Sequence, residues 1–309
     1  MLMKVSVVIS TRNRAASLIG CLQSIEASAG RASLTDAEIV VTDNASDDDT
    51  SSTVTSWAAG ASIPVRLEYE PRPGITIAKN RGLRRASGDI LVLTDDDCRL
   101  REDFFANLLA LYTTKPDMAL RGGRVELGNA EDLPLTIKTD TVGKRWHLSN
   151  APARHENLGN CFLGCNLSMI RAAYQRLGPF DETFGVGRIS AGEDTEYIFR
   201  AYAAGFTLEY VPELVAFHHH GRRTPVEARR LWRNYMIASG ALYAKYFFKC
   251  PSLCRQLQWD LKCLIREALY QENLFLPEYD FSYADKFGCY ASGAASYLRA
   301  MIDRQRRQS

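Results

Sequence analysis

Short apolar runs, each ending at a polar loop, recur through the first hundred residues of this 309-residue chain. The run Val5–Ile9 is β-branched at nearly every position, which is typical of a strand buried on both faces of a parallel sheet. A polar loop over 10–14 follows, and apolar residues then recur at helical spacing from Leu18 to Ile25. The same pattern predicts further strands over 38–41, 65–69 and 89–93 and a helix over 76–86.

These alternating elements predict an α/β fold with a mostly parallel, Rossmann-like sheet flanked by helices. In such a sheet ligands bind at the carboxyl ends of the strands, and the polar clusters of this chain fall at that edge. The chain contains neither the dinucleotide fingerprint G-x-G-x-x-G nor the phosphate loop G-x-x-x-x-G-K-[ST]. The sequence therefore argues against a common dehydrogenase and a P-loop enzyme.

The pattern becomes less regular after Leu100. Residues 128–155 are polar and irregular, and we expect them to form a mobile loop over the ligand site. Recurrent apolar positions from Pro225 onward predict a C-terminal extension of two or three helices. The other expected elements are helices over 104–112 and 195–204, a strand over 120–127 interrupted by Gly122-Gly123, and strands over 161–169, 206–211 and 214–217.

Charge is divided unevenly along the chain. The first 220 residues carry 23 Lys and Arg against 28 Asp and Glu, whereas the remainder carries 15 against 8. This division argues against a nucleic-acid-binding protein with one continuous basic face. It suits an acidic site for a metal and a nucleotide, followed by a segment that either meets an anionic partner or only exposes solvated helix faces.

The chain begins without a basic segment followed by an apolar stretch, so we expect no signal peptide. The longest weakly polar stretch near the end, Tyr235–Ala244, is about half as long as the ~20 apolar residues of a membrane span. We expect a cytoplasmic protein without a transmembrane helix.

The eight cysteines include no C-x-x-C pair. A zinc site at Cys161 with Cys165, or at Cys250 with Cys254, is the alternative to simple thiols, but the usual paired spacing is missing. We expect free and mostly buried thiols.

Asp95, Asp96 and Asp97 follow the predicted strand 89–93 almost directly. Adjacent carboxylates repel one another, and a nearby divalent cation removes that repulsion. Hard oxygen ligands suit Mg²⁺ or Mn²⁺, which also bind substrate phosphates. A solvated acidic turn is the alternative for an isolated triplet, but the buried strand before this one favours a metal site.

Two further groups of titratable residues accompany predicted elements. Glu193 and Asp194 precede the helix 195–204, where either could deprotonate a hydroxyl as general base or simply favour the helix start. His218 directly follows the strand 214–217 and begins a run of three histidines. One imidazole at a strand end can complete a metal shell, although such clusters are also structural.

The loops after the first two strands carry residues that are candidates for binding a nucleotide. The loop over Thr11–Arg14 offers backbone donors and two guanidinium groups for a diphosphate. Asp43 ends the second strand, where its carboxylate could accept an N–H from a base such as uracil. An Asx turn is the alternative for Asp43.

Taken together, these residues resemble the family 2 glycosyltransferases, which have the GT-A fold. The resemblance covers about residues 4–220, and the order and spacing of its motifs are jointly specific. The family often has a proline shortly after its aspartates, where this chain has Arg101-Glu102-Asp103, so Asp96 and Asp97 both stay open as the metal ligand. The motifs are Val5–Arg14, Val41–Asp48, Ala78–Gly82, Gly88–Ile90, Asp95–Asp97, Gly164–Asn166, Gly178–Glu182, Glu193-Asp194 and His218.

The resemblance implies specific roles. Thr11 and Asp43 would bind the base, and Asp95 would lie near the ribose. Asp96 or Asp97 would hold the Mn²⁺ or Mg²⁺ that bridges the diphosphate, with His218 as a late metal ligand. Asp194 would be the base of an inverting displacement, with Glu193 as the second candidate. The remaining expected site residues are Arg12, Asn13, Arg14, Lys79 and Asn80 on the nucleotide-sugar side and Asn166, Asp181 and Glu182 on the acceptor side.

The sequence thus predicts a metal-dependent enzyme that moves a sugar from a nucleoside-diphosphate donor, with UDP favoured, to a saccharide, lipid-linked or other hydroxyl acceptor in polysaccharide or glycoconjugate biosynthesis. The alternatives are a nucleotidyltransferase, against which the glycine-free loop over Ser10–Arg14 argues, and a non-catalytic nucleotide- or sugar-binding module. We expect a catalytic domain over 1–222, with a nucleotide-sugar half over about 1–100 and an acceptor half over about 101–222, and a helical extension over 223–309.

The basic, aromatic extension has two interpretations. It is either a helical cap packed on the catalytic domain or an interfacial segment that touches anionic lipid or a lipid-linked acceptor on the inner face of the membrane. The residues on which the second interpretation depends are Arg229, Arg230, Trp232, Arg233, Tyr235 and Tyr246–Lys249.

Overall fold

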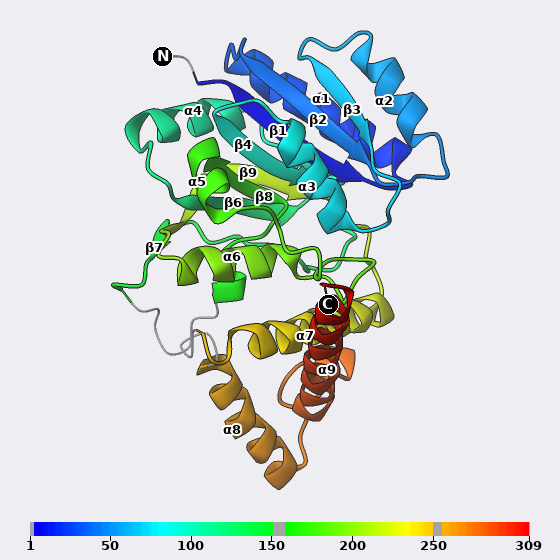
Figure 1. The fold of residues 1–309 in the computed structure, drawn as a ribbon, viewed down its shortest axis with the longest axis vertical. Helices are drawn as coiled ribbons and strands as arrows, with labels where there is room; N and C mark the ends of the chain where they lie inside the picture. Colours follow the sequence, from blue (N-terminus) through cyan, green and yellow to red (C-terminus); the bar gives the residue numbers. More distant parts are fainter. Residues whose placement is uncertain (1–2, 151–157, 250–254, 309) are drawn as a thin grey trace.

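The computed structural model describes residues 3–150, 158–249 and 255–308. The strands of these residues form one sheet in the order β3-β2-β1-β4-β8-β6-β9-β5, and β7 pairs with β9 (Figure 1). The strands are β1 (Val5–Thr11), β2 (Ala37–Asp43), β3 (Val65–Tyr69), β4 (Ile90–Asp95), β5 (Cys98–Leu100), β6 (Leu120–Leu127), β7 (Lys144–Trp146), β8 (Asn166–Ile170) and β9 (Leu208–His218).

The first four strands of this order are parallel, as the sequence predicts. β1 pairs in parallel with both β2 and β4, and β2 pairs in parallel with β3. The other half is mixed, because β8 runs antiparallel to β4 and β6 whereas β6 runs parallel to β9. The α/β prediction is confirmed, and the antiparallel pairs extend the parallel half.

Helices cover both faces of the sheet, because alternate strand residues point to opposite sides. Val7 contributes to the core under α1, α2 and α4, whereas Val8 contributes to the core under α3, α5 and α6. Both side chains are at most 2% exposed. These helices are α1 (Ala15–Arg31), α2 (Thr50–Ala58), α3 (Ile75–Arg85), α4 (Phe104–Thr114), α5 (Arg171–Leu177) and α6 (Glu193–Ala203).

Several expectations for the second half of the chain need correction. The predicted strands 206–211 and 214–217 are one strand, β9, whose register against β6 shifts between Gly123 and Arg124. The glycines do not interrupt β6, and they permit close approach, since a Cβ at Gly122 would lie 2.1 Å from the Phe162 side chain.

The expected loop over 128–155 is only partly irregular. β7 lies within it and pairs with β9, and residues 151–157 fall outside the described part of the chain. The short strand β5 and the helix α5 were not predicted, because three to seven residues are too few for a periodic pattern to emerge. All six cysteines in the described residues are free, as expected; Cys250 and Cys254 lie outside them.

The C-terminal extension contains the helices α7 (Pro225–Tyr246), α8 (Arg255–Tyr270) and α9 (Tyr283–Gln308). α7 begins with a capping box, in which Thr224 and Glu227 bond to each other's backbone N–H groups. In Figure 1 α7 and α9 cross each other below the sheet domain, and α8 projects farthest from it. Tyr246 near its end donates to Glu196 of α6 (2.8 Å), so α7 is joined to the rest of the fold.

Glycines set the distance between α7 and α9. A Cβ at Gly293 would lie 1.8 Å from the carbonyl oxygen of Ile237, and one at Gly240 would lie 2.1 Å from that of Tyr290. These obstacles are backbone atoms, which no rotamer change can remove. The two helices therefore cross at a contact that only glycine permits.

We predict that Gly293→Ala lowers the free energy of unfolding by about 1–3 kcal/mol, because the added methyl group pushes the two helices apart. Gly288→Ala is the matched control in the same helix, where a Cβ meets nothing within 4 Å. That control should raise stability by about 0.5–1 kcal/mol. Urea unfolding of both variants measures the difference, and equal stabilities would contradict the close crossing.

Candidate functional site

A cavity of about 420 Å³ lies at the carboxyl ends of β1, β4 and β9. The start of α6 and one face of α7 complete its wall, so segments from the whole length of the chain meet there. The sequence-predicted residues that line it are Thr11, Arg12, Arg14, Lys79, Asp95, Asp96, Asp97, Glu193, Asp194 and His218.

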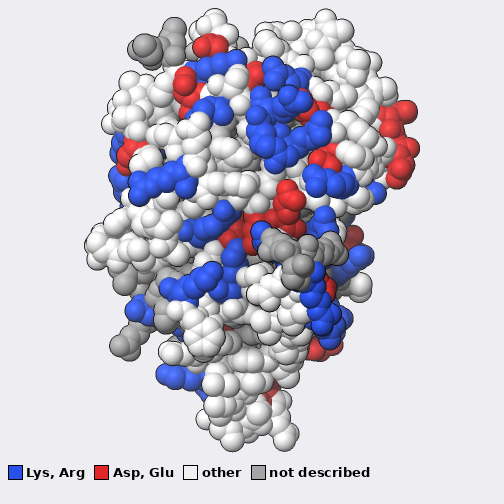
Figure 2. Space-filling view, in the orientation of Figure 1, with Lys and Arg blue, Asp and Glu red and all other residues white. Residues whose placement is uncertain are grey.

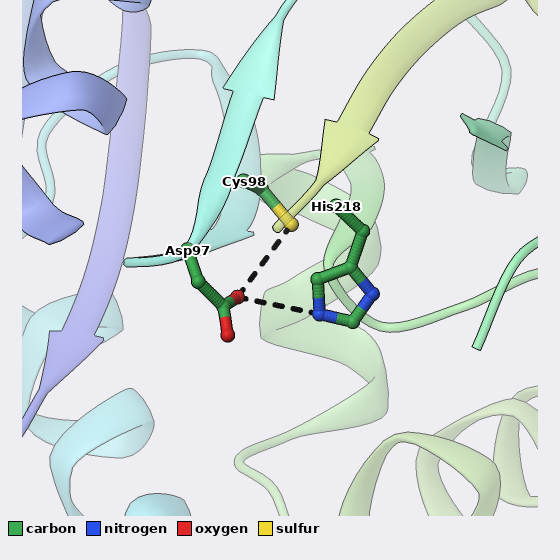
Figure 3. A group of neighbouring side chains, drawn as sticks. All are labelled: Asp97, Cys98 and His218. Atoms are coloured by element: carbon green, nitrogen blue, oxygen red, sulfur yellow. Dashed lines mark hydrogen bonds and ion pairs between the residues drawn. The ribbon is translucent and has the colours of Figure 1, made fainter. Parts of the chain in front are cut away.

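Asp97 and His218 both line this cavity, and their side chains point toward each other (Figure 3). Asp97 Oδ1 lies 3.3 Å from His218 Nε2 and 3.9 Å from Cys98 Sγ. Burial alone would lower the pKa of His218, but the hydrogen bond to Asp97 raises it to about 10. Burial would likewise raise the pKa of Asp97, and the bond from His218 lowers it. In the metal-free protein the pair is therefore an imidazolium facing a carboxylate, and a metal ion that binds His218 Nε2 would displace the proton from that nitrogen.

The donor set of this pair fits a divalent cation. Ligand atoms of Asp97, Cys98 and His218 lie within 4.8 Å of one another. Carboxylate oxygen and imidazole nitrogen together suit Mn²⁺. His218 Nδ1 lies 3.1 Å from the Thr136 hydroxyl, and such a partner behind a histidine orients a metal-ligating imidazole. Cys98 contributes less, because its bond to Cys165 and its burial raise the pKa of the thiol well above the ordinary value, which disfavours the thiolate.

Asp96 points to a different partner. Its Oδ2 accepts a hydrogen bond from the Thr11 hydroxyl (2.7 Å), and burial raises its pKa to about 7. Among the described residues, Asp96 is absent from the group of clustered ligand atoms. Of the two candidates that the sequence left open, the geometry favours Asp97 as the metal ligand.

A buried ammonium group lies among the carboxylates. Lys79 Nζ is 2.8 Å from Glu193 Oε1 and 4.0 Å from Asp95 Oδ1. Burial would lower the pKa of Lys79, but the Glu193 charge raises it. Burial would also raise the pKa of Glu193, and Lys79 lowers it. Glu193 is thus an ionised carboxylate that already has a partner, which disfavours it as a general base.

Asp194 has the opposite electrostatic environment. It sits in the first turn of α6, and its oxygens accept backbone N–H bonds from Gly164 (3.0 Å) and Thr195 (2.7 Å). Burial and then the charge of Glu193 raise its pKa. A Cβ at Gly164 would lie 2.5 Å from the Asp194 side chain, so glycine is required for this approach. A positioned carboxylate with a raised pKa is what general-base chemistry requires.

Two residues that we expected to bind the nucleotide, Asp43 and Asn13, stabilise loops and do not line the cavity. Asp43 is 1% exposed and accepts bonds from the Ser46 N–H (3.0 Å) and the Ser51 hydroxyl, which matches the Asx-turn alternative. Asn13 accepts a bond from the Asp47 N–H (2.7 Å), so it joins the loop after β1 to the loop after β2. Neither side chain faces the cavity.

Four other expected residues also lie outside the cavity. The Asn80 side chain donates to the carbonyl oxygen of Phe180, accepts from the Phe180 N–H and donates to Glu182 (3.3 Å). These bonds tie α3 to the loop after α5. Asp181 accepts from Lys245 (2.6 Å), and the Asn166 amide donates to two backbone carbonyls between strands. Asn166, Asp181 and Glu182 thus hold protein segments together outside the cavity, and their role beside an acceptor stays a prediction.

The C-terminal part of the chain contributes to the cavity, which the sequence pattern did not reveal. Asn234 and Tyr235 of α7 line its wall, as does Arg222 from the loop before that helix. Arg222 Nη1 is buried and has no hydrogen-bond partner among the described residues. An unpaired buried guanidinium N–H favours an anionic ligand. The signal available in the sequence was the pair Arg222-Arg223, one residue after the histidines.

Comparisons with known proteins agree with this geometry. The family described as Glycosyl transferase family 2 matches residues 6–177. Glycosyltransferase AglE of Haloferax volcanii is 24% identical over 69% of this chain and 66% of its own length. An N-acetylglucosaminyltransferase of Sinorhizobium fredii is 30% identical over 50% of this chain and 41% of its own length. The chain therefore spans less than two thirds of these relatives.

Solved structures share the fold. Mannosyltransferase PcManGT from Pyrobaculum calidifontis, in complex with GDP-Man and Mn²⁺, has a TM-score of 0.60 at 20% identity, over 96% of this chain and 88% of that one. S. aureus TarS 1–349 in complex with UDP has a TM-score of 0.56 at 15% identity, over 96% and 92%. The family match over more than half of the chain, together with these likenesses, shows that the chain belongs to glycosyl transferase family 2 and has the GT-A fold.

Proposed function

We propose that this protein is an inverting glycosyltransferase that moves a sugar from a nucleoside-diphosphate donor to a hydroxyl acceptor. The observation that carries the proposal is the meeting, in one cavity, of the Asp97–His218 pair with the half-buried carboxylate of Asp194. UDP is the favoured nucleotide, and a saccharide or lipid-linked acceptor in glycan biosynthesis is the favoured acceptor. TarS 1–349 in complex with UDP and with UDP-GlcNAc, and PcManGT with GDP-Man, support a nucleotide-sugar donor.

Donor binding is assigned to the basic side chains of the cavity. Arg12, Arg14 and Arg222 line it from two loops and supply positive charge for a diphosphate. Asp97 and His218 would hold the divalent cation. When bound, that cation acts as a Lewis acid, stabilising the negative charge that grows on the leaving diphosphate.

The chemical step is assigned to Asp194. Its carboxylate takes the proton of the acceptor hydroxyl, whose oxygen forms a bond to the anomeric carbon of the sugar. The bond from that carbon to the diphosphate oxygen breaks at the same time, and the nucleoside diphosphate leaves with the electron pair. Glu193 is a positioning residue, since its ion pair with Lys79 fixes the first turn of α6, in which Asp194 lies.

The expected division of the chain at residue 222 remains our proposal, with one change. Asn234 and Tyr235 of the extension line the cavity, so we assign the extension a part in acceptor binding. The nucleotide-sugar half over about 1–100 and the acceptor half over 101–222 keep their proposed roles.

We predict that Asp194→Asn lowers kcat by about 10²–10⁴-fold while donor affinity is retained, because the amide cannot accept the proton. Glu193→Gln is the matched control: it keeps the base but leaves Lys79 with a weaker partner. It should keep substantial activity and lose about 3 kcal/mol of stability. Kinetics, calorimetric donor binding and thermal unfolding distinguish the two, and a fully active Asp194→Asn enzyme would contradict the proposed mechanism.

The raised pKa of Asp194 predicts the pH dependence. Only the ionised carboxylate accepts a proton, so kcat/KM should rise with pH along a limb whose midpoint lies above the ordinary aspartate pKa of about 3.9. Glu193→Gln removes a charge that raises this pKa, so the limb should move to lower pH. Profiles recorded below the melting transition of each variant test this, and a limb that moves to higher pH would contradict the assignment.

Donor binding should depend on a divalent cation. We predict that a UDP-sugar stabilises the protein against heat in the presence of Mn²⁺ and much less after EDTA treatment; a ligand at 100 times its Kd adds about 2.7 kcal/mol. His218→Ala should remove most of the Mn²⁺ effect, whereas His147→Ala, which lies outside the cavity, should not. If no nucleotide sugar shifts the melting temperature, the proposed function is wrong.

A further inference from the structure

Helix α8 presents large apolar side chains to solvent. Leu261, Ile265 and Leu269 follow one another at intervals of four and are 49%, 53% and 73% exposed. Trp259 and Tyr270 add 55% and 66% exposed aromatic rings. Residues four apart lie on one side of a helix, so the three aliphatic side chains form a continuous stripe. A stripe of this kind on a small helix is a sign of an interaction surface.

The two carboxylates of α8 point the other way. Asp260 is fully buried and accepts bonds from Lys286 (2.9 Å) and Tyr290 (2.7 Å) of α9. Glu267 is 8% exposed and accepts backbone N–H bonds from Leu274 (2.9 Å) and Ala284 (3.2 Å). The helix is thus anchored to the fold by its two acidic residues together with Leu257, whereas its aliphatic stripe faces solvent and not the core.

The exposed face of α8 is also basic. Arg255, Lys262 and Arg266 are exposed, and Lys262 and Arg266 follow Leu261 and Ile265 directly. The helix contains no acidic residue other than the two buried ones. In Figure 2 the lower end of the molecule, where Figure 1 places α8, is mostly uncharged on the face drawn. The outer surface of α8 therefore combines apolar and positive groups with one neutral amide, Gln258, and no negative charge.

The interfacial interpretation of the extension depended in part on residues of α7, not on those of α8. Trp232 and Tyr235 of α7 pack against the apolar side chains of α9 and the loop before it, so the cap interpretation fits α7. Among the described residues, no helix is both long and apolar enough to cross a bilayer. A contact of α8 with lipid would therefore place the helix along the surface.

We propose that the outer face of α8 binds an anionic lipid surface, with Leu261, Ile265 and Leu269 among the acyl chains and Lys262 and Arg266 at the headgroups. The charges favour this occupant over a second copy of the chain. A two-fold symmetric contact would bring the basic residues of both copies to the same interface without an acidic partner from α8. The proposal is independent of the sugar-transfer reaction.

Co-sedimentation of the full chain with vesicles tests the proposal. The protein should bind vesicles of mixed phosphatidylserine and phosphatidylcholine, and binding should weaken as salt is added. Ile265→Asp combined with Leu269→Asp, and separately Lys262→Glu combined with Arg266→Glu, should each lower the affinity by more than about ten-fold. All four side chains are exposed, so thermal unfolding should be unchanged.

The matched control is Met118→Asp combined with Val142→Asp, which changes two exposed apolar residues outside α8 and should leave vesicle binding intact. The proposal is overturned if the wild-type chain ignores these vesicles, or if the α8 variants bind as well as the control. It is also overturned if light scattering without vesicles shows a dimer that Ile265→Asp with Leu269→Asp dissociates, since a second copy would then cover the face.

Discussion

Five carboxylates share the wall of one cavity, and their mutual repulsion is the constraint on which the site depends. Asp95, Asp96, Asp97, Glu193 and Asp194 all line it, and most are buried or nearly so. Buried charges of one sign are costly unless cations or protons neutralise them. Each carboxylate is handled differently, and these differences give each one its role.

Lys79 neutralises Glu193 from within the protein and also lies 4.0 Å from Asp95, and Thr11 donates a hydrogen bond to Asp96. Asp97 faces His218, the pair that would hold a divalent cation. Asp194 accepts hydrogen bonds from two backbone N–H groups and the Thr195 hydroxyl, and burial and the Glu193 charge raise its pKa although Lys79 lowers it, so it keeps the capacity to accept a proton. The sheet makes this arrangement possible, because strands from distant parts of the chain end at one edge.

Periodicity predicted the parallel half of the sheet, and strand-end position predicted the cluster of Asp95–Asp97 at the end of β4 and His218 at the end of β9. They did not reveal which way a polar side chain turns. Asp43 and Asn166 were expected near ligands, yet each satisfies protein donors or acceptors that the sequence does not disclose. Helical spacing could not identify the outward face of α8 either, because buried partners such as Lys286 of α9 draw its carboxylates inward. Long-range pairing decides these features.

The central claim is that Asp97, between β4 and β5, and His218, at the end of β9, together hold one divalent cation that binds a diphosphate. Anomalous scattering from crystals soaked with Mn²⁺ and UDP tests it most directly. The account predicts one manganese peak bonded to the Asp97 carboxylate, to His218 Nε2 and to the diphosphate of the nucleotide. A nucleotide bound elsewhere, or a manganese peak away from both side chains, would contradict it.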